Sequence, residues 1–101
     1  MLKLKNKICL ITGGTGLIGQ AIVDEFLAQG ATVIFTFNTH SNKAKKLCAG
    51  RERLYCHKMN IKQKSSIKTV LKYIEVKFKK LDVIVNNAGI NKPTDFDKIK
   101  E

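Results

Sequence analysis

A glycine-rich segment near the amino terminus has the residue types and spacing that most directly suggest chemistry. It runs from Thr12 to Gly19 with the letters T-G-G-T-G-L-I-G and follows the apolar run Ile8–Ile11. Glycine allows a chain to turn sharply off a strand and brings its backbone close to a phosphate, which a β-carbon would obstruct. The N–H groups of a helix that follows would face the anion. The segment therefore predicts a loop that holds a pyrophosphate.

The spacing of these glycines fits two known nucleotide-binding patterns. Gly14, Gly16 and Gly19 match the G-x-G-x-x-G fingerprint of dinucleotide-binding loops, in its required context between a strand and a helix. They also fit the G-x-x-x-x-G frame of nucleoside triphosphate loops, which continues with Lys and then Ser or Thr. Gln20 and Ala21 stand there instead, so phosphoryl transfer is disfavoured. A glycine-rich turn that binds no ligand is the alternative.

A second segment of interest is Asn86-Asn87-Ala88-Gly89, at the end of an apolar run. An open parallel sheet presents its ligand crevice at the carboxyl ends of its strands, and small residues there let a cofactor ring lie against the backbone. Asn and Gly are also common in ordinary turns, which is the simpler interpretation of the tetrapeptide. Its occurrence together with the glycine loop favours a role in ligand binding.

Strand and helix patterns alternate along the chain, which is typical of βαβ units with parallel strands. We expect strands at residues 8–12, 31–37, 54–59 and 81–86, and helices at about residues 17–29, 41–49 and 67–78. The first helix is expected to bury Leu17 and Ile18, and Ser41 and either Ser65 or Ser66 are expected to cap the other two. The pattern predicts an α/β fold, a partial Rossmann doubly wound parallel sheet of about four strands in the order 3-2-1-4.

Length and composition are those of one small globular domain, and we treat residues 1–101 as a single dinucleotide-binding unit. No apolar run could cross a bilayer and no secretory signal is recognisable, so we expect a cytoplasmic protein without a membrane partner. The net charge of +11 raises the hypothesis of a nucleic-acid-associated protein. The lysines are scattered without interleaved aromatic residues, however, so we expect no nucleic-acid partner.

The three cysteines, Cys9, Cys48 and Cys56, predict no metal centre and no disulfide framework, because their number is odd and no C-x-x-C spacing occurs. We expect Cys9 to be a buried small hydrophobic residue. Cys56 is followed by His57, but neighbours on a strand point to opposite faces. We therefore expect no metal ligands.

Taken together, the two motifs resemble those of the short-chain dehydrogenase/reductase family, in which T-G-x-x-x-G-x-G follows the first strand and N-N-A-G closes the fourth. The likeness covers essentially the whole chain and is greatest to 3-oxoacyl-acyl-carrier-protein reductases. The pair Gly16-Leu17 is more similar to the sugar-nucleotide epimerase and dehydratase branch, which leaves the substrate class open. The resemblance implies an oxidoreductase that reduces a carbonyl by hydride transfer from NAD(P)H.

The same resemblance implies which residues contact the cofactor. Gly16 joins this set through the fingerprint. The others are Gly13, Thr15, Ile18 and Gly19 beside the pyrophosphate, Asn60 and Ile61 at the adenine, and Asn87, Ala88 and Gly89 on the ribose and nicotinamide side.

The choice between NADP and NAD depends on the residues after the second strand. A carboxylate there binds the ribose 2′-hydroxyl of NAD, and its absence leaves room for a 2′-phosphate. No acid lies between Glu25 and Glu52, and Asn38 offers a polar group at the strand end. The sequence therefore favours NADP, with NAD as the alternative.

Family members carry a catalytic Ser and a Tyr-x-x-x-Lys pair well beyond N-N-A-G, and the given sequence contains no such residues after Gly89. Tyr73 and Lys77 have the right spacing, but they fall in a crossover helix, on the wrong side of the fold. We therefore expect no catalytic residue, and a truncated amino-terminal part of an oxidoreductase that is inactive alone. The alternative is a non-catalytic dinucleotide-binding module, or one that docks on an intact relative. The unpaired backbone groups of the fourth strand and the uncovered apolar surface beside Val83 and Val85 further predict low solubility or self-association.

Overall fold

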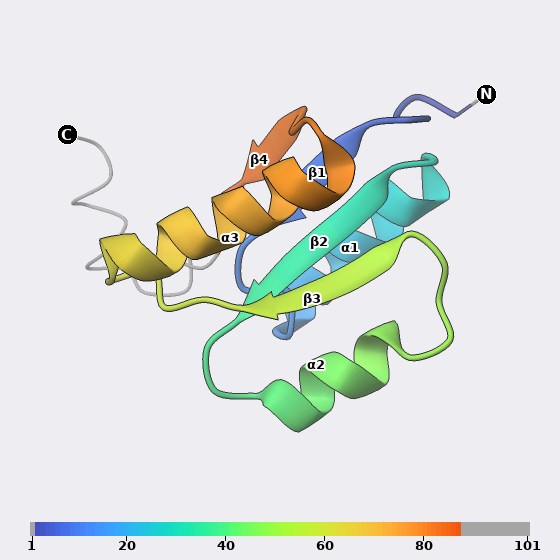
Figure 1. Cartoon of the computed structure of the whole chain (residues 1–101). Helices are drawn as coiled ribbons and strands as arrows, with labels where there is room; N and C mark the ends of the chain where they lie inside the picture. Colours follow the sequence, from blue (N-terminus) through green and yellow to red (C-terminus); the bar gives the residue numbers. More distant parts are fainter. Residues whose placement is uncertain (1, 88–101) are drawn as a thin grey trace, which may run out of the picture.

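Strands and helices alternate strictly along the chain in the computed structural model, which describes residues 2–87. All four strands and the three helices begin and end within three residues of the expected positions, although the fourth strand has three residues instead of the expected six. The sheet is parallel and its order is β3-β2-β1-β4, which confirms the predicted fold (Figure 1). In chain order the elements are β1 (Ile8–Ile11), α1 (Leu17–Ala28), β2 (Thr32–Phe37), α2 (Ser41–Cys48), β3 (Leu54–Lys58), α3 (Lys64–Phe78) and β4 (Val83–Val85).

Helices cover both faces of the sheet. In Figure 1, α3 lies in front of the sheet and α1 behind it. One core, under α1 and α2, is built around Val23, Phe35 and Ala44, and the other, under α3, around Ile34 and Val70. Strand β2 is buried at all but its first residue, because it is a central strand with helices on both faces. This two-sided burial explains its nearly continuous apolar sequence.

The expected serine caps of the second and third helices are wrong. Helix α2 has His40 at its N-cap position and α3 has Gln63, and neither helix has a side-chain hydrogen bond at its cap. The hydroxyl of Ser66 instead accepts a hydrogen bond from the backbone N–H of Asn60, at 2.8 Å. The Ser66 hydroxyl therefore accepts a hydrogen bond from the turn before α3 and does not cap the helix.

The expectation that Leu17 and Ile18 are buried is also wrong. Their exposed fractions are 87% and 55%. Helix α1 packs on the sheet through Gly19 and Val23, and Leu17 lies about 200° around the helix from Gly19. The first turn of α1 therefore presents apolar side chains to solvent at the end of the sheet where the glycine loop lies.

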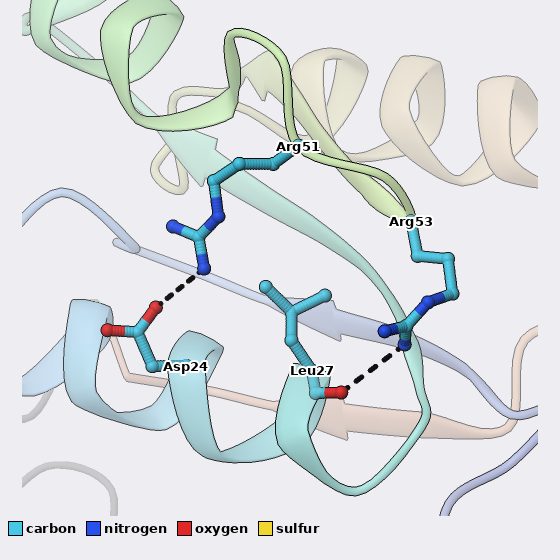
Figure 2. Close-up of polar contacts among 4 residues, drawn as sticks. All are labelled: Asp24, Leu27, Arg51 and Arg53. Atoms are coloured by element: carbon cyan, nitrogen blue, oxygen red, sulfur yellow. Dashed lines mark hydrogen bonds and ion pairs between the residues drawn. The ribbon is translucent and has the colours of Figure 1, made fainter.

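Two arginines from the segment between α2 and β3 reach helix α1 (Figure 2). Arg51 pairs with Asp24 across 3.0 Å, and Arg53 donates to the carbonyl oxygens of Leu27 and Ala31 at 3.3 and 2.7 Å. The last carbonyls of a helix carry partial negative charge, which a guanidinium offsets. These contacts fix the start of β3 against the end of α1.

Candidate cofactor site

The glycine loop leaves β1 through a left-handed residue and is fixed to the end of β2. Gly13 has a φ of 71°, a conformation that glycine adopts without strain. Its N–H donates to the hydroxyl of Thr36 at 3.2 Å, and the N–H of Gly14 donates to the Thr36 carbonyl at 3.0 Å. These two amides are therefore engaged within the fold. An anion would instead meet the first turn of α1, whose N–H groups have no partner inside the helix.

Gly19 is the residue that brings α1 close to the loop. A β-carbon there would lie 2.8 Å from the Gly14 Cα atom and 2.9 Å from the Asn87 Nδ2 atom, which is closer than packed atoms approach. Gly16, in contrast, has nothing within 4 Å of such a carbon. Gly19 is thus required by packing, whereas Gly16 borders open space at the start of the helix.

Asn87 connects the end of β4 to the glycine loop through its side chain. The residue is 1% exposed, and its Nδ2 donates to the Gly13 carbonyl at 2.9 Å. Its Oδ1 has no hydrogen-bond partner within residues 2–87 and is buried. Such an unpaired acceptor is uncommon, because desolvating it has a free-energy cost. The buried Oδ1 of Asn87 lies next to the glycine loop, and a β-carbon at the neighbouring Gly19 is excluded. Both features fit a site where a ligand would donate a hydrogen bond to Asn87.

A cavity of about 90 Å³ lies between the ends of β2 and β3, and we call it the β2–β3 pocket. It brings together three of the predicted site residues, Gly13, Asn38 and Ile61. Asn60, also predicted at the adenine, does not line this pocket, and its Oδ1 accepts a hydrogen bond from the N–H of Lys62 at 3.0 Å. The remaining lining residues are Thr36, Phe37 and Met59.

The other predicted contact residues have different surroundings. Thr15 is buried, and its carbonyl accepts a hydrogen bond from Gln20 Nε2 at 2.8 Å. Ile18 is exposed on the first turn of α1. Ala88 and Gly89 lie outside the described residues. The roles of all these residues toward a cofactor stay predictions.

Tyr73 and Lys77 lie away from this site, among aromatic side chains between α3 and β3. The Tyr73 ring lies 5.0 Å from that of His57, and the Lys77 ammonium lies 5.0 Å from the centre of the Tyr55 ring. Burial raises the pKa of Tyr73, whereas a tyrosine that exchanges a proton near neutral pH needs a lowered pKa. Tyr73 and Lys77 therefore have the spacing of the catalytic motif, but the pKa of the tyrosine is shifted in the opposite direction.

The exposed apolar surface beside the fourth strand is centred on Ile84. This side chain is 59% exposed, whereas Val83 and Val85 are half-buried and pack toward α1. Ile84 lines a groove of about 220 Å³ together with Leu71 of α3 and Ile61. The predicted self-association remains to be measured.

The structure gives two further findings about the part of the chain that it describes. Within residues 2–87, no three His, Cys, Asp or Glu side chains are grouped closely enough to hold a metal ion. In the same range, no helix combines the length and the apolar character needed to span a membrane.

The parallel sheet order, the glycine turn and the helix that follows it define a fold unit of the Rossmann type. More particularly, the chain belongs to the short chain dehydrogenase family, whose model matches residues 7–101.

Known relatives resemble the chain over most of its length. It is 35% identical to a 3-oxoacyl-acyl-carrier-protein reductase of Salmonella typhimurium, over 99% of the chain and 41% of that protein. A (+)-borneol dehydrogenase of Salvia officinalis is 31% identical over 91% of the chain and 33% of its own length. A solved structure of a putative 3-oxoacyl-reductase from Bacillus thuringiensis has a TM-score of 0.77 at 25% identity, covering 82% of the chain and 36% of that protein. The chain thus spans roughly two fifths or less of these proteins.

Proposed function

We propose that this chain binds NADP, and NAD more weakly, as the nucleotide-binding part of an oxidoreductase that reduces a carbonyl. The observation that carries this proposal is the close approach of Gly19 to Gly14 and Asn87. It keeps the start of α1 next to the glycine loop, where backbone N–H groups can face a diphosphate. The names of the matched reductases support the same chemistry. When bound, the nicotinamide supplies a hydride to the carbonyl carbon.

Two parts of the site match parts of the proposed cofactor. The first turn of α1 would hold the pyrophosphate, and the β2–β3 pocket beside Ile61 would receive the adenosine. Asn38 is exposed at the edge of that pocket, where the 2′-phosphate of NADP would lie. The preference for NADP follows because no carboxylate follows β2 to repel that phosphate.

We further propose that the 101 residues do not catalyse reduction alone and that the protein is cytoplasmic. Tyr73 supports the first point, because its raised pKa opposes proton transfer near neutral pH. Nucleotide binding without turnover is the expected behaviour. The alternative, a module that docks on an intact relative, is supported by the exposed groove at Ile84.

Titration of the folded chain with NADPH and with NADH, followed by calorimetry, tests the proposal. We expect tighter binding of NADPH. The Asn38→Asp variant places a carboxylate at the pocket edge and should weaken NADPH binding about ten-fold or more, equivalent to about 1.4 kcal/mol, with little change for NADH. Asn38→Ser is the matched control, since it keeps the site neutral and should retain the preference.

Two results would contradict the proposal. If neither nucleotide binds to a chain that circular dichroism shows to be folded, the site is not a dinucleotide site. If Asn38→Asp and Asn38→Ser change NADPH binding equally, the 2′-phosphate does not lie at Asn38.

A further inference from the structure

Two of the three cysteines come together in the fold although the sequence gives no sign of it. Cys48 is the last residue of α2, and Cys56 lies in the middle of β3. Both are half-buried and pack against the same core, the one under α1 and α2. They lie on the two elements, α2 and β3, that pack against each other.

The packing of α2 on β3 explains this arrangement. Ala44, one helical turn before Cys48, is fully buried against the sheet, and Leu54, two residues before Cys56, is buried in the same core. Residues two apart on a strand share a face. Cys56 therefore points to the side of the sheet that α2 covers. His57 points to the opposite side, where it meets Tyr73.

We propose that Cys48 and Cys56 form a redox-active dithiol site, which hydrogen peroxide or a related two-electron oxidant converts into an intramolecular disulfide. The proposal goes beyond the cofactor-binding function and does not depend on it, since neither cysteine lines the β2–β3 pocket. Its effect would be to join the carboxyl end of α2 covalently to β3.

The two sulfurs have different parts in the reaction. The S–H of Cys48 donates to the Ala44 carbonyl at 3.2 Å, and burial raises the pKa of Cys48 to about 12. Because this hydrogen bond holds the Cys48 proton, we assign the first attack on peroxide to Cys56. Cys48 resolves the product and gives up its proton as its sulfur attacks.

The reaction balances in two steps. The Cys56 thiolate attacks one peroxide oxygen, the O–O bond breaks, and the hydroxide that leaves takes up a proton to form water, which leaves a sulfenic acid on Cys56. The Cys48 sulfur then attacks the Cys56 sulfur, the S–O bond breaks, and the hydroxide released takes the Cys48 proton as a second water. In sum, two thiols and one peroxide give one disulfide and two waters, and a dithiol reductant reverses the change by thiol–disulfide exchange.

The decisive measurement compares the folded chain with the same chain unfolded in urea. Both are equilibrated in glutathione redox buffers, and the fraction with a Cys48–Cys56 disulfide is found by peptide mass mapping. We expect the equilibrium constant to be about ten-fold or more higher in the folded chain, because the fold holds the two thiols together. An equal or lower constant in the folded chain would overturn the proposal. This test needs no substitution, so a poorly folding variant cannot obscure it.

Peroxide treatment of single variants tests the assigned order. In Cys48→Ser, Cys56 should accumulate as a sulfenic acid that dimedone traps, whereas in Cys56→Ser, Cys48 should stay reduced. Cys9→Ala is the matched control and should still form the disulfide, since Cys9 is fully buried on β1. Separate overoxidation of Cys48 and Cys56 in the unsubstituted chain, without a link, would contradict the dithiol site.

Discussion

Strands β1 and β4 are joined by a side chain at each end of the sheet, and the two joints differ in chemistry. At the amino end, the Asp82 carboxylate accepts the N–H of Ile8 at 2.7 Å and pairs with Lys80 across 3.2 Å. At the carboxyl end, the Asn87 amide donates to the carbonyl of Gly13 at 2.9 Å. One joint is charged and partly exposed to solvent, and the other is neutral and buried.

This difference separates an end that only closes the sheet from the end at which we propose the cofactor site. At the amino end, the Oδ2 atom of Asp82 has hydrogen-bonding partners, and the Asp82 side chain is partly exposed to solvent. The neutral joint keeps the Oδ1 atom of Asn87 buried without a partner in the described chain, next to a position where only glycine fits. A fold accepts such a cost where a ligand is to be held. The carboxyl end is therefore the one expected to tolerate least change.

The largest effect is expected from Gly19→Val at the carboxyl end. The added side chain would overlap the backbone of the glycine loop and the amide of Asn87, so α1 would have to move away. We expect a loss of about 3 kcal/mol or more in the free energy of unfolding, measured by urea denaturation. Gly16→Ala is the matched control, because a β-carbon there meets open space. Equal stability of the two variants would show that the close approach at Gly19 is not required.

The next effect is expected from Asn87→Asp, which puts a charged joint at the buried end. The carboxylate would face the Gly13 carbonyl without a donor, which should lower the unfolding free energy at pH 7 by about 3 kcal/mol. Burial raises the pKa of such a carboxyl group above its unfolded value, so the loss should be absent below about pH 4 and grow as the pH rises. Urea denaturation at several pH values measures this trend. A variant whose stability falls on acidification would contradict the neutral character of this end.

The alternating pattern was sufficient to predict the sheet order, because continuous apolar runs such as Thr32–Phe37 leave few places for a buried strand. The glycine loop was predictable for a similar reason, since its turn depends on the backbone of Gly13. The exposure of Leu17 was not predictable, because helical spacing does not say which side of a helix meets the sheet. The anchoring of the loop by Thr36 could have been suspected, since Thr36 is the one polar residue in the buried part of β2, residues 33–37.

Side-chain partners far apart in sequence were beyond prediction. The resemblance to a family placed Asn87 beside the cofactor, but not its contact with Gly13, which depends on the register of β4 against β1. The position of Cys48 and Cys56 against one core has no signal in their spacing, because it arises only when α2 packs on β3. Both features depend on three-dimensional packing rather than on any local pattern.

The smallest effect is expected from Asp82→Asn, which makes the amino-end joint neutral. The hydrogen bond from Ile8, and next the contact with Lys80, lower the pKa of Asp82 below its ordinary value. A group with a lowered folded pKa stabilises the fold above its unfolded pKa of about 3.9 and loses this contribution as the pH falls through the folded pKa. The unsubstituted chain should therefore be slightly more stable than Asp82→Asn at pH 7, and the difference should vanish in strong acid. Thermal melts of both proteins across this pH range measure the difference in stability. A difference that does not depend on pH would mean that the charge of Asp82 does not stabilise the contact between β1 and β4.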